Sequence, residues 1–284
     1  MAAVQAIASL SATVQLSGDK EAPPHPAHLR WLLALYDALN DDDDEIREAA
    51  AAAAAPILGQ TLVPIEAGDR LVRWLSARYA RDETFRAHVA SRMIGASSYP
   101  SYPSSPSSSS PLLLFTTTTS SSSSPHPPWI PPAAQLLADA LRPDDSLFVV
   151  EEQNLYVDEV REARRWSAAY VAVTSLLPPS PSTTTVRYQL EAWLLAALRE
   201  LTRLAADSSE ENGSHPLGWS SKPQVFAIAA RVLLGASAVV AVSTSEEEGR
   251  STEIREALAR FRDLGPGRRV SGLLLGLCRC GGGE

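Results

Sequence analysis

The fold is decided by the hexapeptide DEVREA at residues 158–163, because two close copies of it lie elsewhere in the chain. DEIREA occupies residues 44–49 and TEIREA occupies residues 252–257. In each copy a branched apolar residue can face a core, and the acidic residues suit the partial positive charge of a helix N-terminus. The first residue of each copy is of a type that caps helices. The residues predicted to cap are Asp44, Asp158 and Thr252.

The spacing of the copies indicates a helical repeat protein. Glu159 and Glu253 are 94 residues apart, which corresponds to two units of about 47 residues. Glu45 and Glu159 are 114 residues apart, and removing a low-complexity stretch of roughly 35 residues leaves two units of roughly 40. Both values fit HEAT and armadillo repeats. A helical pair that stood alone would expose its apolar face, so the units are expected to stack.

Apolar side chains recur at helical spacing along most of the chain, as in residues 29–39 and 190–204. No stretch of useful length alternates with a period of two, so no sheet is predicted. The sequence therefore predicts an all-α, HEAT/armadillo-like solenoid of stacked antiparallel helix pairs. In such repeats an Asp and an Arg three residues later can pair with neighbouring units along a ladder. The predicted ladder and capping residues are Asp44, Arg47, Asp158, Arg161, Thr252 and Arg255.

A segment rich in Ser, Thr and Pro interrupts these patterns at residues 97–132. It cannot bury enough apolar surface to offset the entropy lost on ordering, so a disordered insert is predicted. A phosphorylated or docking segment is the alternative. The predicted organisation is N-terminal helical repeats over 1–96, the insert, and C-terminal helical repeats with a flexible tail over 133–284.

Composition excludes several classes of site. The chain has 25 Lys and Arg against 33 Asp and Glu, and a net charge of -8 argues against a general nucleic-acid surface but leaves room for a local basic stripe. Two cysteines exclude a disulfide framework and a four-cysteine zinc site. No glycine-rich phosphate loop stands between a strand and a helix. We therefore expect no cofactor, no metal and no catalytic residues, and hence a protein that is not an enzyme. An enzyme in its own right is the alternative, which a pocket with converging titratable groups would favour.

The apolar run 225–242 is nearly long enough to span a bilayer, but it carries Arg231 in its middle. A central arginine costs about 2.5–3.5 kcal/mol on insertion scales, which favours a buried helix of an all-α core over a membrane span. The N-terminus shows neither an early basic residue nor an apolar signal-peptide core. A cytoplasmic location without membrane contact is expected.

Two kinds of surface are candidates for partner binding. Residues 144–156 join an apolar run to a polar one, and they are either a packed loop, with Asn154 bonded to backbone, or a partner-contact surface. Arginines cluster near Trp166 and near Phe261, where they either contact an RNA backbone or are solvated helix faces. The candidate partner residues are Glu151, Glu152, Asn154, Tyr156 and Arg161. The clustered arginines are Arg161, Arg164, Arg165, Arg260, Arg262, Arg268 and Arg269.

Three stretches also carry a resemblance to a known family. Residues 147–163, with the run EEQNLY and with Trp166, resemble the C-terminal region of the THADA-like family of fungi. Residues 35–48 and 64–75 are similar to the same region. The resemblance covers most of residues 30–280 apart from the insert. The EEQNLY run is distinctive, whereas the Asp-Glu-Ile-Arg pattern is shared by many HEAT proteins.

The resemblance implies a HEAT-like fold and a non-catalytic partner of a 2'-O-ribose methyltransferase that acts on the anticodon loop of tRNA. It implies contact with that methyltransferase, and local basic patches are expected to contact tRNA. Members of the family are far longer than 284 residues, so the chain is expected to be a C-terminal fragment. A HEAT adaptor for protein partners, without RNA involvement, is the alternative function.

Overall fold

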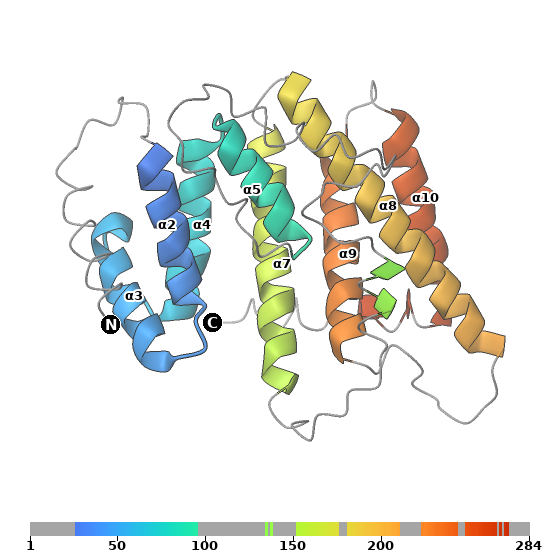
Figure 1. The fold of residues 1–284 in the computed structure, drawn as a ribbon, viewed down its shortest axis with the longest axis horizontal. Helices are drawn as coiled ribbons and strands as arrows, with labels where there is room; N and C mark the ends of the chain where they lie inside the picture. Colours follow the sequence, from blue (N-terminus) through green and yellow to red (C-terminus); the bar gives the residue numbers. More distant parts are fainter. Residues whose placement is uncertain are drawn as a thin grey trace. The chain divides into compact units, whose positions relative to one another are not determined.

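The structure is a computed structural model of the whole chain. It describes residues 26–95, 134–135, 137–138, 152–175, 181–210, 223–243, 248–265, 267–268 and 270–272. All regular elements among them are helices, which confirms the all-α prediction (Figure 1). The predicted insert and the predicted flexible tail beyond residue 272 lie outside the described residues.

The chain divides into two compact units, Met1–Phe85 and Arg86–Glu284. The first unit contains three helices that pack on one another, and it ends just after a fourth begins. These helices are α2 (Pro26–Leu39), α3 (Asp44–Leu58), α4 (Pro64–Tyr79) and α5 (Glu83–Met93). Within the unit α2 packs against α3 and α4, and α3 packs against α4. The predicted domain boundaries at the insert stay a prediction.

The core of the first unit follows from the apolar stripes of its helices. Leu32 and Tyr36 of α2, and Leu71 and Leu75 of α4, are at most 1% exposed. Burying a side chain of this size stabilises a fold by about 1.5–3 kcal/mol, so these positions hold the helices together. Pro64 stands at the start of α4, as its missing N–H predicts.

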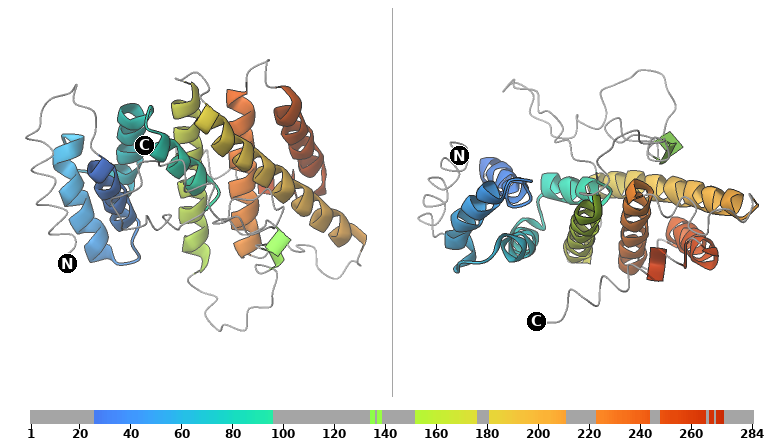
Figure 2. Two further views of the ribbon diagram at one scale, coloured as in Figure 1. Left: turned by 45° about the horizontal axis from the view of Figure 1, so that its top comes forward. Right: turned by 90° about the horizontal axis from the view of Figure 1, so that it is seen from below.

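The second unit contains the end of α5 and four long helices (Figure 2). These are α7 (Glu152–Ser175), α8 (Pro181–Glu210), α9 (Pro223–Val242) and α10 (Glu248–Asp263). The most extensive contact is between α7 and α9, while α8, α9 and α10 all pack against one another. Trp166, Trp193 and Phe261 are at most 1% exposed and fill the space between these helices.

Helix α9 is buried to a large degree by its neighbours. Among the described residues, Val225–Val242 is the one stretch that is long and apolar enough to cross a membrane, and 67% of it is buried inside the structure. A core helix passes the same test of length and composition. The burial fits the interpretation of this run as a core helix.

The predicted caps are wrong in all three copies of the motif. Helix α3 is capped by Asp43, whose side chain accepts a hydrogen bond from the Glu45 amide at 2.8 Å, so Asp44 is the first helical residue. Helix α7 begins at Glu152 and helix α10 at Glu248. Asp158 and Thr252 therefore lie inside their helices.

Candidate functional site

The candidate partner residues belong to α7 and to the residue before it. Glu152, Asn154 and Tyr156 lie in the first two turns of α7, so the packed-loop interpretation is wrong for this part of residues 144–156. Glu151 and the side chains of residues 152–157 lie outside the described residues. The described member of the set is Arg161, which lies two turns further along α7.

Arg161 forms an ion pair within its own helix. Its Nη1 lies 2.6 Å from Oδ1 of Asp158, and both side chains are at least one third exposed. Arg47 and Asp44 form the equivalent pair within α3. In both copies the pair joins residues three positions apart on one helix, so the described part of the chain shows no ladder between repeats at these positions. In the third copy Thr252 is partly exposed and Arg255 is exposed on α10.

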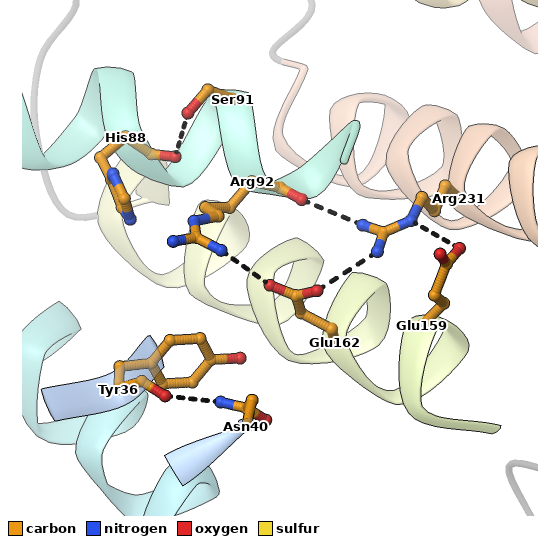
Figure 3. A network of polar contacts seen from close by, with 8 residues as sticks. All are labelled: Tyr36, Asn40, His88, Ser91, Arg92, Glu159, Glu162 and Arg231. Carbon is orange, nitrogen blue, oxygen red and sulfur yellow. Dashed lines mark hydrogen bonds and ion pairs between the residues drawn. The ribbon is translucent and has the colours of Figure 1, made fainter. Parts of the chain in front are cut away.

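Glu162 contacts two arginines in the second unit, on the face of α7 that meets α5 and α9 (Figure 3). Its Oε1 lies 3.4 Å from Nη1 of Arg92, and its Oε2 lies 3.2 Å from Nη2 of Arg231. Arg92 belongs to α5 and Arg231 to α9. One carboxylate therefore links three helices.

Arg231 is the centre of this cluster. Its side chain is only 10% exposed, and its Nε lies 3.5 Å from Oε2 of Glu159, in addition to the contact with Glu162. Its Nη1 also donates to the backbone carbonyl of Arg92 at 3.3 Å, in the last turn of α5. A cation is favourable there because unpaired carbonyls give a helix C-terminus partial negative charge. The guanidinium thus holds the end of α5 against α7 and α9.

Gly95 allows the chain to pass close to this guanidinium. Its φ of 81° lies in the left-handed region, and a Cβ there would stand 3.1 Å from Cδ of Arg231. Both the backbone conformation and the space favour glycine at the position where the chain leaves α5.

His88 lies one turn before Arg92 and is half-buried. Its ring meets Trp166 edge-on, with the two centroids 5.3 Å apart. Burial, and secondarily the charge of Arg92, lowers the pKa of His88 to about 3. The imidazole is therefore neutral at physiological pH, and its role is packing between α5 and α7.

The cluster of Arg92, Glu159, Glu162 and Arg231 can stabilise the arrangement of three helices. Its charges balance, since two arginines face two carboxylates. Among the residues that the structure describes, no group of three or more His, Cys, Asp and Glu could hold a metal ion. The sequence marks Arg231 as a charge within an apolar run but does not identify its partners, because the contacts join residues 69 or more positions apart.

The arginine clusters proposed for RNA contact lack accessible aromatic rings. Trp166 and Phe261, the aromatic residues beside those clusters, are both 0% exposed. A base cannot stack on a ring that lies inside the core. The solvated-face interpretation therefore fits these arginines better.

Comparison with known families identifies the chain. A family model described as the Trm72 ARM-like repeat region matches residues 73–280. The chain belongs to this family. The match confirms the resemblance of the sequence to the C-terminal region of THADA-like proteins. The Trm72 family is a family of non-catalytic regulatory partners and is related to tRNA methylation. No curated protein and no solved structure gives a significant match.

Proposed function

We propose that the chain is a non-catalytic scaffold for a 2'-O-ribose methyltransferase that modifies the anticodon loop of tRNA. The observation that carries this proposal is the match of the Trm72 ARM-like repeat region to residues 73–280. In this account the methyltransferase carries out the chemistry. The helical repeats bind the enzyme and hold it in a productive orientation, since correct positioning alone can supply several kcal/mol of a reaction barrier.

The packing of the second unit supports a rigid docking platform. Trp166 and Trp193 lie in a close-packed core, and Glu162 ties three helices together through two arginines. A rigid surface loses little conformational entropy when a partner binds, which favours affinity. The same features would serve an adaptor for other protein partners, so the test has to identify the partner.

The N-terminal half of α7 is the proposed partner surface. It contains Glu152, Asn154, Tyr156 and Arg161, with Glu151 just before it. The Asp158–Arg161 pair lies in the same part of the helix and is accessible to a partner. We place the complex in the cytoplasm.

Affinity purification of the full gene product, followed by mass spectrometry of bound protein and RNA, tests the proposal. We expect a 2'-O-ribose methyltransferase among the captured proteins. Recovery of other partners without a methyltransferase or tRNA would support the adaptor function instead.

Charge reversal tests the surface. Glu151→Lys with Glu152→Lys is expected to weaken methyltransferase binding by about tenfold or more, because like charges across an interface repel. Glu253→Lys with Glu256→Lys makes the same change of charge at exposed positions of α10 and serves as the control. Equal binding by both variants and the wild type would remove α7 from the interface.

A further inference from the structure

The outer face of α4, in the first unit, carries a row of exposed arginines. Residues 70–81 contain four arginines and no acidic residue, in a chain whose net charge is -8. Arg70, Arg73 and Arg78 lie within an arc of about 140° on α4 at 3.6 residues per turn. Trp74 lies within the same arc, and Arg81 follows two residues after the helix ends at Tyr79. The members of this stripe are Arg70, Arg73, Trp74, Arg78 and Arg81.

All four arginines are exposed, and Trp74 is partly exposed. From Arg70 to Arg78 the stripe follows the helix for about 12 Å, at 1.5 Å per residue. Its opposite face carries Leu71, Leu75 and Tyr79, which are buried in the core of the first unit. The stripe is thus fixed in place by the packing of α4.

Carboxylates lie at both ends of the stripe, with Glu66 and Asp69 before it and Asp82 and Glu83 directly after Arg81. Glu66 and Asp69 stand four residues before Arg70 and Arg73, the spacing at which helical ion pairs form. Arg73 instead donates from Nε to the backbone carbonyl of Asp69 at 3.3 Å, and Arg70 lies beside the side-chain amide of Gln60. Within the described parts of the chain no ion pair involves any of the four arginines. Their charge is directed at solvent.

The helix dipole explains only part of the stripe. Arg78 lies in the last turn of α4, where a cation is favourable. Arg70 and Arg73 lie near the middle of the helix, where the dipole has little effect. Four solvated arginines on one face also repel one another, which suggests a binding role for the arrangement.

We infer that the α4 stripe binds the phosphate backbone of RNA. Arginine is suited to this task because its planar, always charged guanidinium binds phosphate oxygens in bidentate fashion. The Arg78 guanidinium lies 5.7 Å from the ring centroid of Trp74, so the charges stand beside an aromatic surface. Arginine and aromatic side chains together are typical of proteins that bind unpaired bases next to a phosphate backbone.

The choice of tRNA as the RNA rests on the proposed function, whereas the stripe itself does not. The negative charge of the whole chain opposes long-range attraction of RNA, so the contact depends on a local positive field. The stripe supplies such a field, and it differs from the arginine clusters near Trp166 and Phe261 in having a partly exposed aromatic neighbour.

The test compares two variants of the full chain that lose the same charge. One replaces the four stripe arginines with glutamine, as Arg70→Gln, Arg73→Gln, Arg78→Gln and Arg81→Gln. The control replaces four exposed arginines of the second unit, as Arg255→Gln, Arg260→Gln, Arg262→Gln and Arg268→Gln. Circular dichroism and thermal melts check that both variants fold like the wild type.

Binding is measured by fluorescence anisotropy with a labelled, unmodified tRNA transcript between 50 and about 200 mM salt. We expect the stripe variant to lose at least about tenfold in affinity at low salt. The slope of a plot of log K against log salt concentration should also become less negative by about two to three, because three or four phosphate contacts are lost. The control is expected to stay within about threefold of the wild type.

The inference would be overturned if the two variants lost affinity equally, or if the control lost more. It would also be overturned if the wild-type chain showed no measurable binding of tRNA. Displacement of tRNA by polyglutamate as readily as by unlabelled tRNA would also overturn it and would indicate an acidic peptide as the ligand. Capture of the methyltransferase is measured on the same samples. A wild-type chain that binds tRNA through the stripe but captures no methyltransferase would overturn the proposed function and leave this inference standing.

Discussion

The hydrogen bond from the Glu45 amide to the Asp43 side chain fixes the residue at which α3 begins. An N-cap of this type contributes about 1 kcal/mol, because it satisfies an amide that has no partner inside the helix. We predict that Asp43→Ala lowers the free energy of unfolding of the first unit by about 1 kcal/mol. Urea denaturation followed by circular dichroism measures the change.

Asp42→Ala is the matched control for the cap. It removes the same charge from the same loop, and Asp42 is exposed. We expect it to cost less than half as much, since only the attraction to the helix dipole is lost. Equal effects of the two substitutions would show that charge, and not the hydrogen bond, stabilises the start of α3.

The half-buried imidazole of His88 links stability to pH. Its pKa of about 3 in the folded chain lies below the ordinary value of 6.5, so the unfolded chain binds a proton between these two values that the folded chain does not bind. The contribution of His88 to stability is therefore intact above pH 6.5 and decreases as the pH falls. We predict a loss of about 1.4 kcal/mol per pH unit well below pH 6.5.

His88→Gln isolates this contribution, because glutamine does not titrate. Subtracting the stability of the variant from that of the wild type at each pH removes the effects shared by all other groups. The difference should be constant above pH 7 and should fall between pH 6 and pH 4. A difference that does not change with pH would show that His88 is accessible to protons in the folded chain.

Between helices, the carboxylate of Glu162 links α5, α7 and α9. Its removal leaves Arg231, whose side chain is 10% exposed, with only the more exposed Glu159 as an acidic partner. Breaking a buried ion pair on one side is strongly destabilising, and here Glu159 and partial exposure reduce the cost. We predict that Glu162→Gln lowers the free energy of unfolding by about 2 kcal/mol, measured by urea denaturation.

Glu256→Gln is the control for Glu162→Gln. It breaks a pair of the same type, Glu256 with Arg260 at 3.4 Å, but both side chains are at least 60% exposed. Exposed pairs of this kind contribute about 0.3–0.5 kcal/mol. Comparable losses in the two variants would contradict a structural role for the Glu162 cluster.

The helices themselves could be predicted from the sequence, because their apolar stripes are local signals. Residues 29–39 and 190–204 form parts of α2 and α8, and Pro64 opens α4, as expected. The start of α7 could not be predicted, since Asp158 is of a type that caps helices but the helix begins six residues earlier, at Glu152. The copy at residues 44–49 follows three aspartates, and only the geometry shows that Asp43 reaches the Glu45 amide.

The ion-pair cluster could not be predicted for a different reason. Arg92, Glu162 and Arg231 lie about 70 residues apart in the sequence, and each is a common residue type on a helix. Arg231 carried the one usable signal, because a charge within an apolar helix requires a partner. The identity of the partner depends on how α7 and α9 pack, which the periodicity of neither helix determines.

At the scale of the whole molecule, the match over residues 73–280 connects this chain to tRNA methylation. Helical repeats that belong to a family of regulatory partners act by binding and positioning. We therefore propose that the chain promotes methyl transfer by another protein and does not catalyse it.

Reconstitution tests this claim most directly. The experiment combines the purified chain with a purified 2'-O-ribose methyltransferase of the same source, an unmodified tRNA transcript and a radiolabelled methyl donor. Methylation of the anticodon loop is then measured with each protein alone and with both proteins together. We predict no transfer by the chain alone and a rate with both proteins at least about tenfold above that of the methyltransferase alone, which corresponds to about 1.4 kcal/mol of barrier. Transfer by the chain alone, or a rate that the chain leaves unchanged, would contradict the account.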